Sequence, residues 1–400
     1  MSINKITGKS FLIINHYAGA PKYGPAFRHY DISRELINQG HRVCIVASSS
    51  SHLRSSPDCR KENIDGVDFI WVKCLKYSGY GFKRFLNMVL FSFNLFFYQK
   101  HFPFRPDFVM VSSPSPFPII NGLYLKIRYK AKFLYEIRDV WPKSIIELKG
   151  ISKNNMLIMF LNMLDYLGLK YSDYVVSPLN NIELYLKERN FKNRKSIFLP
   201  NGIANIEPRK NILRTKNEKK FIVGYGGNLS DNNSIMNLID AAIILKDNDE
   251  ILFEIIGFGE LENEIKNLVK RKKLKNIQLS GRLSKEELFN ALSICDTLYK
   301  GNPTRDIYKY GISSIKLVEY MILKKPILDA SNGDNMVTNS KSGVSVENEN
   351  PDELAKAILR LSRMDDVVIA EMGQSGYDYV KENYLYSNTV ADMLSEIIQL

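Results

Sequence analysis

Lys316 and Glu319 are a lysine and a glutamate three residues apart, and side chains of these types at this spacing could bind one ligand together. They lie in GISSIKLVEYMILKKPILDA (311–330), which predicts a loop, a short helix and a strand. On a helix the two side chains share one face. Lys316 could meet a diphosphate, and Glu319 could accept hydrogen bonds from the hydroxyls of a ribose. The alternative is a solvated surface pair without a ligand.

The loop before this helix adds backbone donors. Ser313 and Ser314 can cap the helix, and the N–H groups of residues 311–315 would then face an anion. Together with Lys316, these donors predict a cradle for a nucleotide diphosphate.

A glycine turn, GYGGNLS (224–230), follows a predicted strand and precedes a helix expected to start at Ser230 or Asp231. This order is typical of a phosphate-binding helix N-terminus. The motif is not a complete GxGxxG with a downstream acidic residue, which argues against a dinucleotide site. A tight turn without a ligand is the alternative.

Two loops of the N-terminal half could also contribute to a site. YAGAPKYGP (17–25) carries Gly19 and Gly24, which allow close backbone approach to a ligand, although a plain connecting loop explains them equally well. EIRDVWPKS (136–144) places Arg138 and Asp139 at a strand end, as a functional pair or a structural Arg–Asp pair. His16 ends the first predicted strand, where a satisfied structural histidine is the plainer interpretation.

The elements that must position these loops alternate between strands and helices almost throughout. Buried strands are predicted at 10–16, 42–49 and 221–228, among others, and helices separate them. This alternation favours an α/β fold with two Rossmann-like doubly wound parallel-sheet domains that face a central cleft. The predicted divisions are an N-terminal domain (1–200), a linker (201–218), a C-terminal domain (219–382), and a helix (383–400) that could pack back on the N-terminal domain.

The net charge of +12 is uneven along the 400 residues. Residues 1–200 contain 29 Lys and Arg against 14 Asp and Glu, whereas residues 201–400 contain 26 against 29. A basic half suggests an anionic partner, for which nucleic acid, anionic lipid and phosphorylated substrates all fit. The alternative is the lysine bias of an AT-rich genome.

Other signals bound the class of protein. Cys44, Cys59, Cys74 and Cys295 form no CxxC pair, Cys44 and Cys295 are expected in the core, and a reduced cytosolic compartment is the natural interpretation. The first residues lack a signal-peptide pattern, and the apolar run at 85–98 is too short to span a bilayer. DND (247–249) is expected to be a surface turn, and no metal site is predicted.

Taken in order, the motifs resemble a retaining glycosyltransferase of family 4 with the GT-B fold, most closely the WbuB-like subgroup of bacterial O-antigen or capsule enzymes. The resemblance rests on the glycine loop, EIRDVWP, LPNGI (199–203), the glycine turn, IIGFGE, LSGRL and SSIKLVEYMILKKPIL. It covers nearly the whole chain.

The resemblance implies roles for individual residues. Glu319 matches the second Glu of the family's EX7E motif, which binds the ribose, whereas Gly311 stands in place of the first Glu. Lys316 takes the position at the diphosphate. The implied nucleotide-binding residues are Gly226, Gly227, Asn228, Gly281, Arg282, Ser314, Lys316, Leu317 and Glu319.

In the same comparison, Asn228 and Asn233 replace a basic pair of the family. Arg138 and Asp139 fall beside the transferred sugar, with Asp139 as the predicted polar catalytic residue. Residues predicted to bind the acceptor are His16, Lys22 and Gly24.

The implied reaction is retaining transfer from a nucleotide sugar, most simply a UDP-sugar, without a metal or other cofactor. The implied acceptor is a saccharide on undecaprenyl pyrophosphate at the inner leaflet, with the anionic membrane surface as a partner and no nucleic acid. A helix over 83–100, with Phe91, Phe93 and Phe97, is expected to lie on the membrane surface or to line the acceptor site. The alternative is a helix buried under the N-terminal sheet. Alternatives are a GT-B-type UDP-sugar epimerase, an NAD-dependent oxidoreductase, and an inactive membrane-peripheral scaffold.

Overall fold

The structure is a computed structural model that describes residues 8–24, 27–77, 81–206, 220–333 and 335–398. It divides into two compact units. Unit 1 contains residues 1–204 together with 386–400, and unit 2 contains residues 205–385. Most of the predicted linker, 207–218, lies outside the described residues.

Unit 1 is built on an eight-stranded sheet with the order β3-β4-β2-β1-β5-β6-β7-β8. Every neighbouring pair is parallel except β3 with β4. The strands are β1 (Ser10–Ile14), β2 (Arg42–Ser48), β3 (Lys61–Ile64), β4 (Val67–Val72), β5 (Phe108–Ser112), β6 (Lys132–Glu136), β7 (Tyr174–Ser177) and β8 (Ser196–Phe198). The central strands are continuous apolar runs, because helices cover both faces of a parallel sheet.

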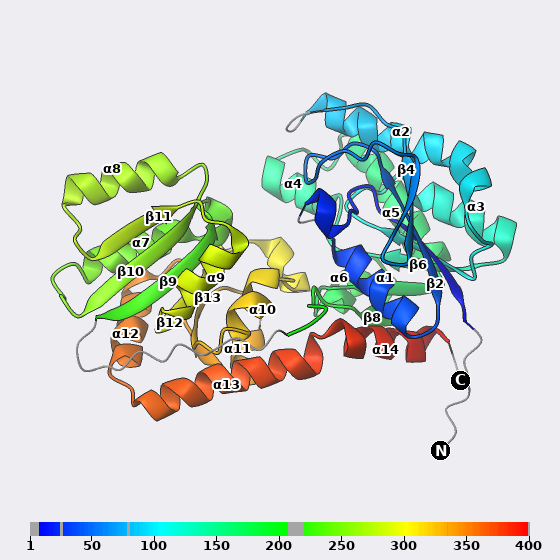
Figure 1. The fold of residues 1–400 in the computed structure, drawn as a ribbon. Helices are drawn as coiled ribbons and strands as arrows, with labels where there is room; N and C mark the ends of the chain where they lie inside the picture. Colours follow the sequence, from blue (N-terminus) through cyan, green and yellow to red (C-terminus); the bar gives the residue numbers. More distant parts are fainter. Residues whose placement is uncertain (1–7, 25–26, 78–80, 207–219, 334, 399–400) are drawn as a thin grey trace, which may run out of the picture. The chain divides into compact units, whose positions relative to one another are not determined.

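The helices of unit 1 connect these strands. They are α1 (Arg28–Asn38), α2 (Phe82–Tyr98), α3 (Ile119–Tyr129), α4 (Lys143–Lys149), α5 (Met156–Tyr171), α6 (Ile182–Glu188) and α14 (Tyr386–Ile397). Helix α14, at the end of the chain, packs against α1 and β8 of the same unit (Figure 1). Tyr386, Val390 and Met393 of α14 belong to the main hydrophobic core of unit 1. The C-terminal segment is therefore part of the N-terminal fold.

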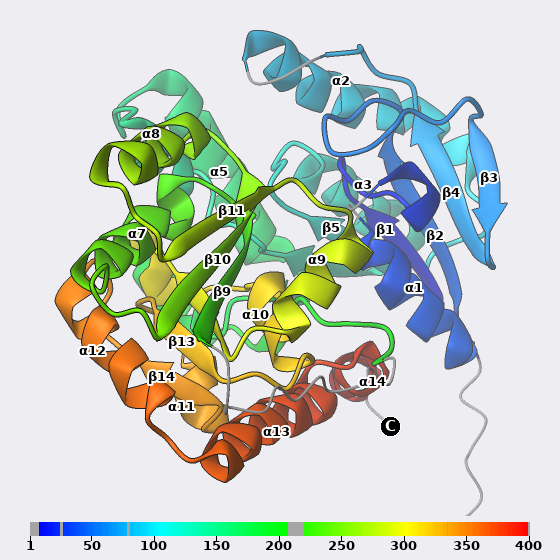
Figure 2. The same cartoon turned by 60° about the vertical axis from the view of Figure 1, so that its left-hand side comes forward.

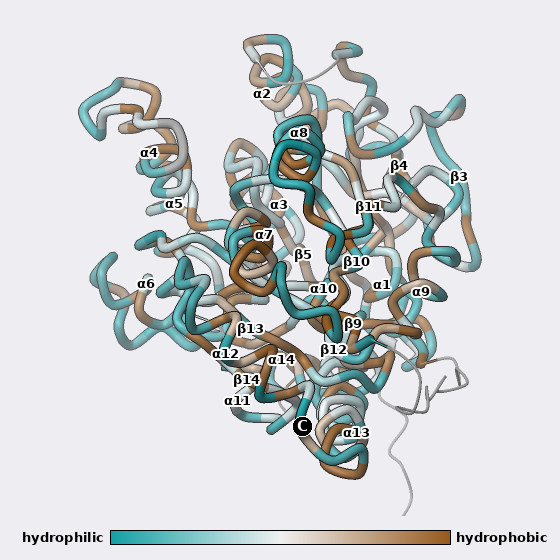
Figure 3. The backbone as a smooth tube through the Cα atoms, turned by 90° about the vertical axis from the view of Figure 1, so that its left-hand side faces the viewer, coloured by the Kyte–Doolittle hydropathy of each residue, from teal (hydrophilic) through white to brown (hydrophobic). Residues whose placement is uncertain are grey.

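Unit 2 is built on a six-stranded parallel sheet with the order β11-β10-β9-β12-β13-β14 (Figure 2). Its strands are β9 (Phe221–Asn228), β10 (Ile251–Phe258), β11 (Ile277–Gly281), β12 (Thr297–Gly301), β13 (Ile327–Ala330) and β14 (Gly343–Ser345). Its helices are α7 (Ile235–Ile244), α8 (Glu262–Lys272), α9 (Lys285–Ser293), α10 (Ile315–Met321), α11 (Met336–Ser340), α12 (Pro351–Ser362) and α13 (Asp366–Asn383). Figure 3 shows that α7 is hydrophobic along most of its length, whereas α8 is largely hydrophilic.

The predicted fold class is confirmed, because both units are parallel-sheet α/β structures. The buried thiols of Cys44 and Cys295 are confirmed as well. The predicted helix start at Ser230 or Asp231 is only partly right: a short 3-10 helix covers Asp231–Asn233, and α7 begins at Ile235. The change falls at Ser234, whose φ of 45° lies in the left-handed region and interrupts the helix.

The predicted helix over 83–100 is present as α2, but one of its expected membrane residues is wrong. Phe91 is 0% exposed and packs in the interior, whereas Phe93 and Phe97 are exposed. The buried-helix alternative is therefore correct for one face of α2 only. Among the described residues, no helix combines the length and the apolarity that crossing a bilayer requires.

Candidate functional site: a half-buried lysine at a glycine turn

The carboxyl ends of three neighbouring strands bring the predicted nucleotide-binding residues of unit 2 to one edge of the sheet. The register pairs Gly227 of β9 with Gly257 of β10, and Asn228 with Phe258. Gly281 ends β11, which lies on the other side of β10. In open parallel sheets, ligands bind beyond this edge.

Lys316 of α10 points at the glycine turn of β9. Its Nζ donates hydrogen bonds to the Tyr225 hydroxyl at 3.2 Å and to Asn233 Oδ1 at 3.1 Å, and it lies 4.4 Å from the centroid of the Tyr225 ring. Gly227 has a φ of 148°, and a Cβ atom there would lie 2.6 Å from this Nζ. The backbone conformation therefore favours glycine at this position, and a side chain there would also displace the end of Lys316.

The charge of Lys316 is held in an unfavourable environment. Burial, together with the charge of nearby Lys300, lowers the pKa of Lys316 to about 8. Both hydrogen-bond acceptors are neutral, so they compensate the ammonium less well than a carboxylate would. An anion bound at the glycine turn would supply the missing negative charge.

Two tyrosines that sequence reasoning missed hold the turn in place. The Tyr320 hydroxyl accepts from the N–H of Gly226 at 2.8 Å and donates to its carbonyl at 3.0 Å. The Tyr225 hydroxyl donates to the carbonyl of Asn228 at 2.6 Å. The signal available in the sequence was their position: Tyr225 lies inside the glycine motif, and Tyr320 directly follows Glu319.

The start of α10 follows the prediction in part. The Ser314 hydroxyl accepts from the N–H of Leu317 at 3.4 Å and so caps the helix. Leu317 is fully buried, and its N–H is taken up by this cap, so its predicted contact with the nucleotide stays a prediction. Gly311 has a φ of 107°, a conformation that residues with a side chain rarely adopt. A glutamate at 311 would be strained, which gives a physical reason for the glycine there.

Glu319 and Lys316 do not form the surface pair that their spacing allows. The Glu319 carboxylate instead forms an ion pair with Lys285 of α9 at 3.0 Å, close to solvent. Arg282, just after β11, stacks its guanidinium over the Phe258 ring at 4.7 Å. Gly281, with a φ of 63°, makes the turn that precedes it. The ribose role of Glu319 and the nucleotide-binding role of Arg282 stay predictions.

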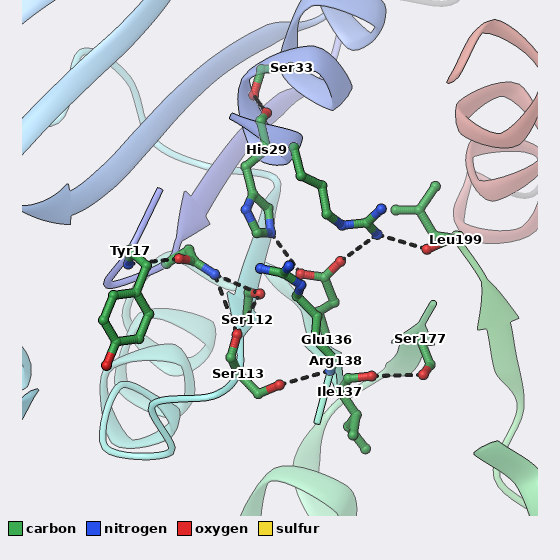
Figure 4. A network of polar contacts seen from close by, with 12 residues as sticks. Tyr17, His29, Ser33, Ser112, Ser113, Glu136, Ile137, Arg138, Ser177 and Leu199 are labelled. Atoms are coloured by element: carbon green, nitrogen blue, oxygen red, sulfur yellow. Dashed lines mark hydrogen bonds and ion pairs between the residues drawn. The ribbon is translucent and has the colours of Figure 1, made fainter. Parts of the chain in front are cut away.

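Unit 1 contains a buried polar network at the end of β6 (Figure 4). Glu136 accepts hydrogen bonds from His29 Nε2 at 2.7 Å and from Arg28 Nη2 at 2.9 Å. Arg28 also donates to the carbonyl of Leu199 at 2.7 Å and to that of Pro200. Burial alone would raise the pKa of Glu136, but the charges of its partners hold it well below its usual range. This network was not predicted from the sequence.

The predicted catalytic pair lies beside this network. Arg138 points toward Glu136 in Figure 4, and the N–H groups of Arg138 and Asp139 donate to the Ser113 hydroxyl at 2.7 and 3.2 Å. The charge of Glu136 acts on Arg138 more strongly than that of Asp139. The protein atoms packed around the Asp139 carboxyl raise its pKa by desolvation, against the charge of Arg138, although the residue as a whole is exposed to solvent. The described structure has no ion pair between Arg138 and Asp139.

The three predicted acceptor residues lie in unit 1, and their contact with an acceptor stays a prediction. His16 is buried between the Tyr17 and Phe91 rings, with centroids at 4.6 and 5.0 Å. Burial and the nearby arginine charges lower the pKa of His16 to about 3, so the ring is neutral at pH 7. Lys22 lies at the surface and forms an ion pair with Glu62. Gly24 has a φ of 140° and approaches the backbone near Leu53.

No metal-binding group was predicted, and the part of the chain that the structure describes contains no cluster of three His, Cys, Asp or Glu side chains with metal-site geometry. The cations of this edge of unit 2 are side chains, Lys316 and Arg282.

Two protein-family models match the chain in succession. The model described as Glycosyltransferase Family 4 matches residues 24–204, and the model described as Glycosyl transferases group 1 matches residues 210–377. These ranges correspond closely to the two structural units.

Curated relatives agree with these matches. An uncharacterized glycosyltransferase of Methanocaldococcus jannaschii is 29% identical over 53% of this chain and 55% of its own length. The poly(ribitol-phosphate) alpha-N-acetylglucosaminyltransferase of Staphylococcus aureus is 26% identical over 54% of this chain and 44% of its own. A putative colanic acid biosynthesis glycosyl transferase of Escherichia coli is 22% identical over 61% and 64%. The alignments thus span about half to two thirds of each relative.

Solved structures show the same fold over the whole chain. Sucrose-phosphate synthase from Thermosynechococcus elongatus has a TM-score of 0.72 at 15% identity, covering 98% of both chains. HepE from Anabaena in complex with UDP has a TM-score of 0.67 at 12% identity, covering 98% of this chain and 100% of its own. The chain therefore has the GT-B fold, and its two parts match two glycosyltransferase family models in succession.

Proposed function

We propose that this protein transfers a sugar from a nucleotide donor, a UDP-sugar, to a lipid-linked or oligosaccharide acceptor, with retention of anomeric configuration. The observation that carries the proposal is the Lys316 ammonium, half-buried with neutral hydrogen-bond partners at a glycine turn, at the carboxyl ends of the strands of a parallel sheet. A diphosphate bound at the glycine turn would provide the negative charge that the neutral partners of Lys316 lack. The structures of HepE from Anabaena, which has the same fold, in complex with UDP and with UDP-glucose support this choice of donor.

The residues of unit 2 would divide the donor between them. Lys316 would stabilise the negative charge that grows on the diphosphate as it leaves, which is where a fixed cation accelerates transfer most. Glu319 would exchange its exposed ion pair with Lys285 for the ribose hydroxyls. Arg282 and its Phe258 platform would face the base. In this proposal, side chains rather than a metal ion supply the positive charge.

Unit 1 would bind the acceptor and provide the polar side chains beside the transferred sugar. We assign the role beside the transferred sugar to Asp139, with Arg138 anchored by the Glu136 network. Lys22 already forms an ion pair with Glu62, whereas neither ring nitrogen of the buried His16 has a hydrogen-bond partner within the described residues. The basic charge of this half suits a pyrophosphate-linked acceptor in O-antigen or capsule synthesis, at the cytoplasmic face of the inner membrane.

A donor screen tests the function. The protein is incubated with single nucleotide sugars and a polyprenyl-pyrophosphate-linked saccharide, and the products are read by mass spectrometry. We expect one UDP-sugar to add one sugar residue to the acceptor, with the donor's anomeric configuration preserved in the NMR spectrum. Absence of transfer from every nucleotide sugar, or conversion of the donor alone as an epimerase would cause, would contradict the proposal. An inverted product would overturn retention.

A further inference from the structure

Four basic side chains of unit 1 come from the segments that follow three neighbouring strands. His16 follows β1, and Arg84 lies at the start of α2, which follows β4. His52 and Arg54 follow β2, and the three strands are neighbours in the order β4-β2-β1. In open parallel sheets, ligands bind beyond the carboxyl ends of the strands, which is where these segments begin. We call these four residues the basic cluster.

The ring of Tyr17 contacts three members of the basic cluster. Its centroid lies 4.6 Å from that of the His16 ring and 5.6 Å from that of the His52 ring. The Arg84 guanidinium lies over the same ring at 5.4 Å, and Arg84 Nε donates to the Tyr17 hydroxyl at 3.1 Å. The backbone N–H of Tyr17 donates to Asn15 Oδ1 at 2.8 Å, just after β1 (Figure 4). Two histidines and one arginine therefore meet at one aromatic ring that the backbone fixes in place.

His16 is buried without the hydrogen bonds that a buried imidazole normally makes. Its exposed fraction is 1%, and within the described residues neither ring nitrogen has a hydrogen-bond partner. Burial of unpaired polar atoms costs free energy, and the large majority of such atoms in folded proteins have a partner. A ligand oxygen that enters the basic cluster would provide one for the ring N–H of His16.

Arg54 places a buried charge beside this histidine. The residue is 7% exposed, and its guanidinium donates to the backbone carbonyls of Ala18 at 2.8 Å, of Ser55 at 3.2 Å and of Ser48. Burial lowers the pKa of Arg54 to about 10, and the side chains that oppose this shift are two tyrosines rather than a carboxylate. The charge of Arg54 is therefore bound by neutral groups, and it acts on its surroundings.

The basic cluster concentrates positive charge at a place that a ligand can reach. Besides burial, the charges that lower the pKa of His16 are those of Arg54, Arg84 and His52. Burial and the charge of Arg84 also lower the pKa of His52. His52 and Arg84 are only half-buried, so both are accessible from solvent. An anion bound here would balance the charges and would favour protonation of both histidines.

We propose that the basic cluster binds a phosphate group of the sugar acceptor. Arg84 and His52 would donate to the phosphate oxygens, since charged hydrogen bonds to phosphate are among the strongest in proteins. His16 would donate from beneath, and Arg54 would contribute through its charge rather than by contact. The donor diphosphate is assigned to Lys316 in unit 2, so a phosphate in unit 1 belongs to the second substrate, and this step rests on the proposed function. The phosphate comes from a lipid-linked diphosphate or from a soluble sugar phosphate.

Isothermal titration of the full chain in saturating UDP tests the proposal, because UDP then occupies the nucleotide site of unit 2. The probes are geranyl diphosphate, glucose 1-phosphate and geraniol, which represent a lipid-linked diphosphate, a soluble sugar phosphate and a lipid without phosphate. We expect wild type to bind geranyl diphosphate and not geraniol. Arg84→Met should weaken the binding of geranyl diphosphate about 10–100-fold, as expected for the loss of a charged hydrogen bond, and Arg84→Lys should keep part of the affinity.

His52→Gln is a second variant, at a half-buried position, and should weaken the binding of geranyl diphosphate about tenfold. The control Arg128→Met changes an exposed arginine that also lies over a tyrosine ring, that of Tyr124 at 6.0 Å, near the end of α3. This control should bind geranyl diphosphate like wild type. Thermal unfolding of each variant verifies that it is folded.

The proposal is overturned if Arg84→Met and His52→Gln bind geranyl diphosphate as tightly as wild type does. It is also overturned if wild type binds neither phosphate compound, or binds geraniol equally well. Tighter binding of glucose 1-phosphate than of geranyl diphosphate, with the same loss in Arg84→Met, would support the phosphate site and assign it to a soluble acceptor.

The titration also separates this inference from the proposed function. Arg84→Met and His52→Gln should keep the UDP affinity of wild type, because neither residue belongs to unit 2. If sugar transfer takes place and both variants bind geranyl diphosphate normally, only the phosphate site is wrong. If binding of geranyl diphosphate depends on Arg84 but no nucleotide sugar is a donor, the site stands and the proposed function is wrong.

Discussion

Replacing Glu136 by leucine is expected to lower the free energy of unfolding of unit 1 by about 3–5 kcal/mol, the usual cost of removing one partner from a buried ion pair. The substitution leaves the Arg28 guanidinium and the His29 ring buried without their shared acceptor. Arg28 also tethers the carbonyls of Leu199 and Pro200, so the segment after β8 should loosen. Chemical denaturation, followed by tryptophan fluorescence, measures the change.

The contribution of Glu136 to the free energy of unfolding depends on pH. The folded pKa of Glu136 lies below its unfolded value, so its stabilising effect is present above the unfolded pKa of about 4.3 and is lost as pH falls through the folded pKa. Glu136→Leu should therefore lose less stability on acidification than wild type. The control Glu188→Leu removes a partly exposed ion pair with Lys143 and should cost less than about 1 kcal/mol. Equal losses for the two variants would show that the network does not anchor this fold.

Replacing Lys316 by methionine is expected to weaken UDP binding about 10–100-fold, the loss of one charged hydrogen bond of about 1.5–3 kcal/mol. Methionine keeps the length of the side chain and the packing against the Tyr225 ring, so the loss reports on charge. Isothermal titration with UDP measures it. The control Lys356→Met, on an exposed position of α12, should bind UDP like wild type.

The same variant should be more stable than wild type when no ligand is present. The folded pKa of Lys316, about 8, lies below its unfolded value of about 10.4, so its charged form destabilises the fold at neutral pH. The gain for Lys316→Met should be on the order of 2 kcal/mol at pH 7 and should shrink as pH rises from 8 to 10.4. Thermal unfolding at several pH values measures this. A variant that loses stability and keeps UDP affinity would identify Lys316 as purely structural.

The sequence predicted the fold because strand-like apolar runs and helical segments alternate, a local signal. It also predicted which elements carry the nucleotide-binding candidates, because Gly227 lies near the end of a strand and Lys316 lies in a short helix. The partners of these residues were not predictable, because they lie far apart in the chain. Lys316 meets Tyr225 across 91 residues, and His29 meets Glu136 across 107.

Burial explains the remaining differences. Periodicity indicates that α2 and α5 have apolar faces but not which face another element covers, so Phe91 was wrongly grouped with Phe93. The short strands β3, β8 and β14 carry too few residues for an alternation pattern to predict them. At Gly311, where the resemblance implies a glutamate, the positive φ favours a glycine.

If Lys316 binds the diphosphate and Glu319 binds the ribose of one nucleotide, their substitution should affect the binding of UDP and of pyrophosphate differently. Both ligands are titrated into wild type, Lys316→Met and Glu319→Ala. We expect Lys316→Met to weaken the binding of both ligands. Glu319→Ala should weaken UDP binding about tenfold, by the loss of hydrogen bonds to a charged group, and leave pyrophosphate binding unchanged. If both variants bind UDP as tightly as wild type, the nucleotide lies elsewhere and the assignment of this site is wrong.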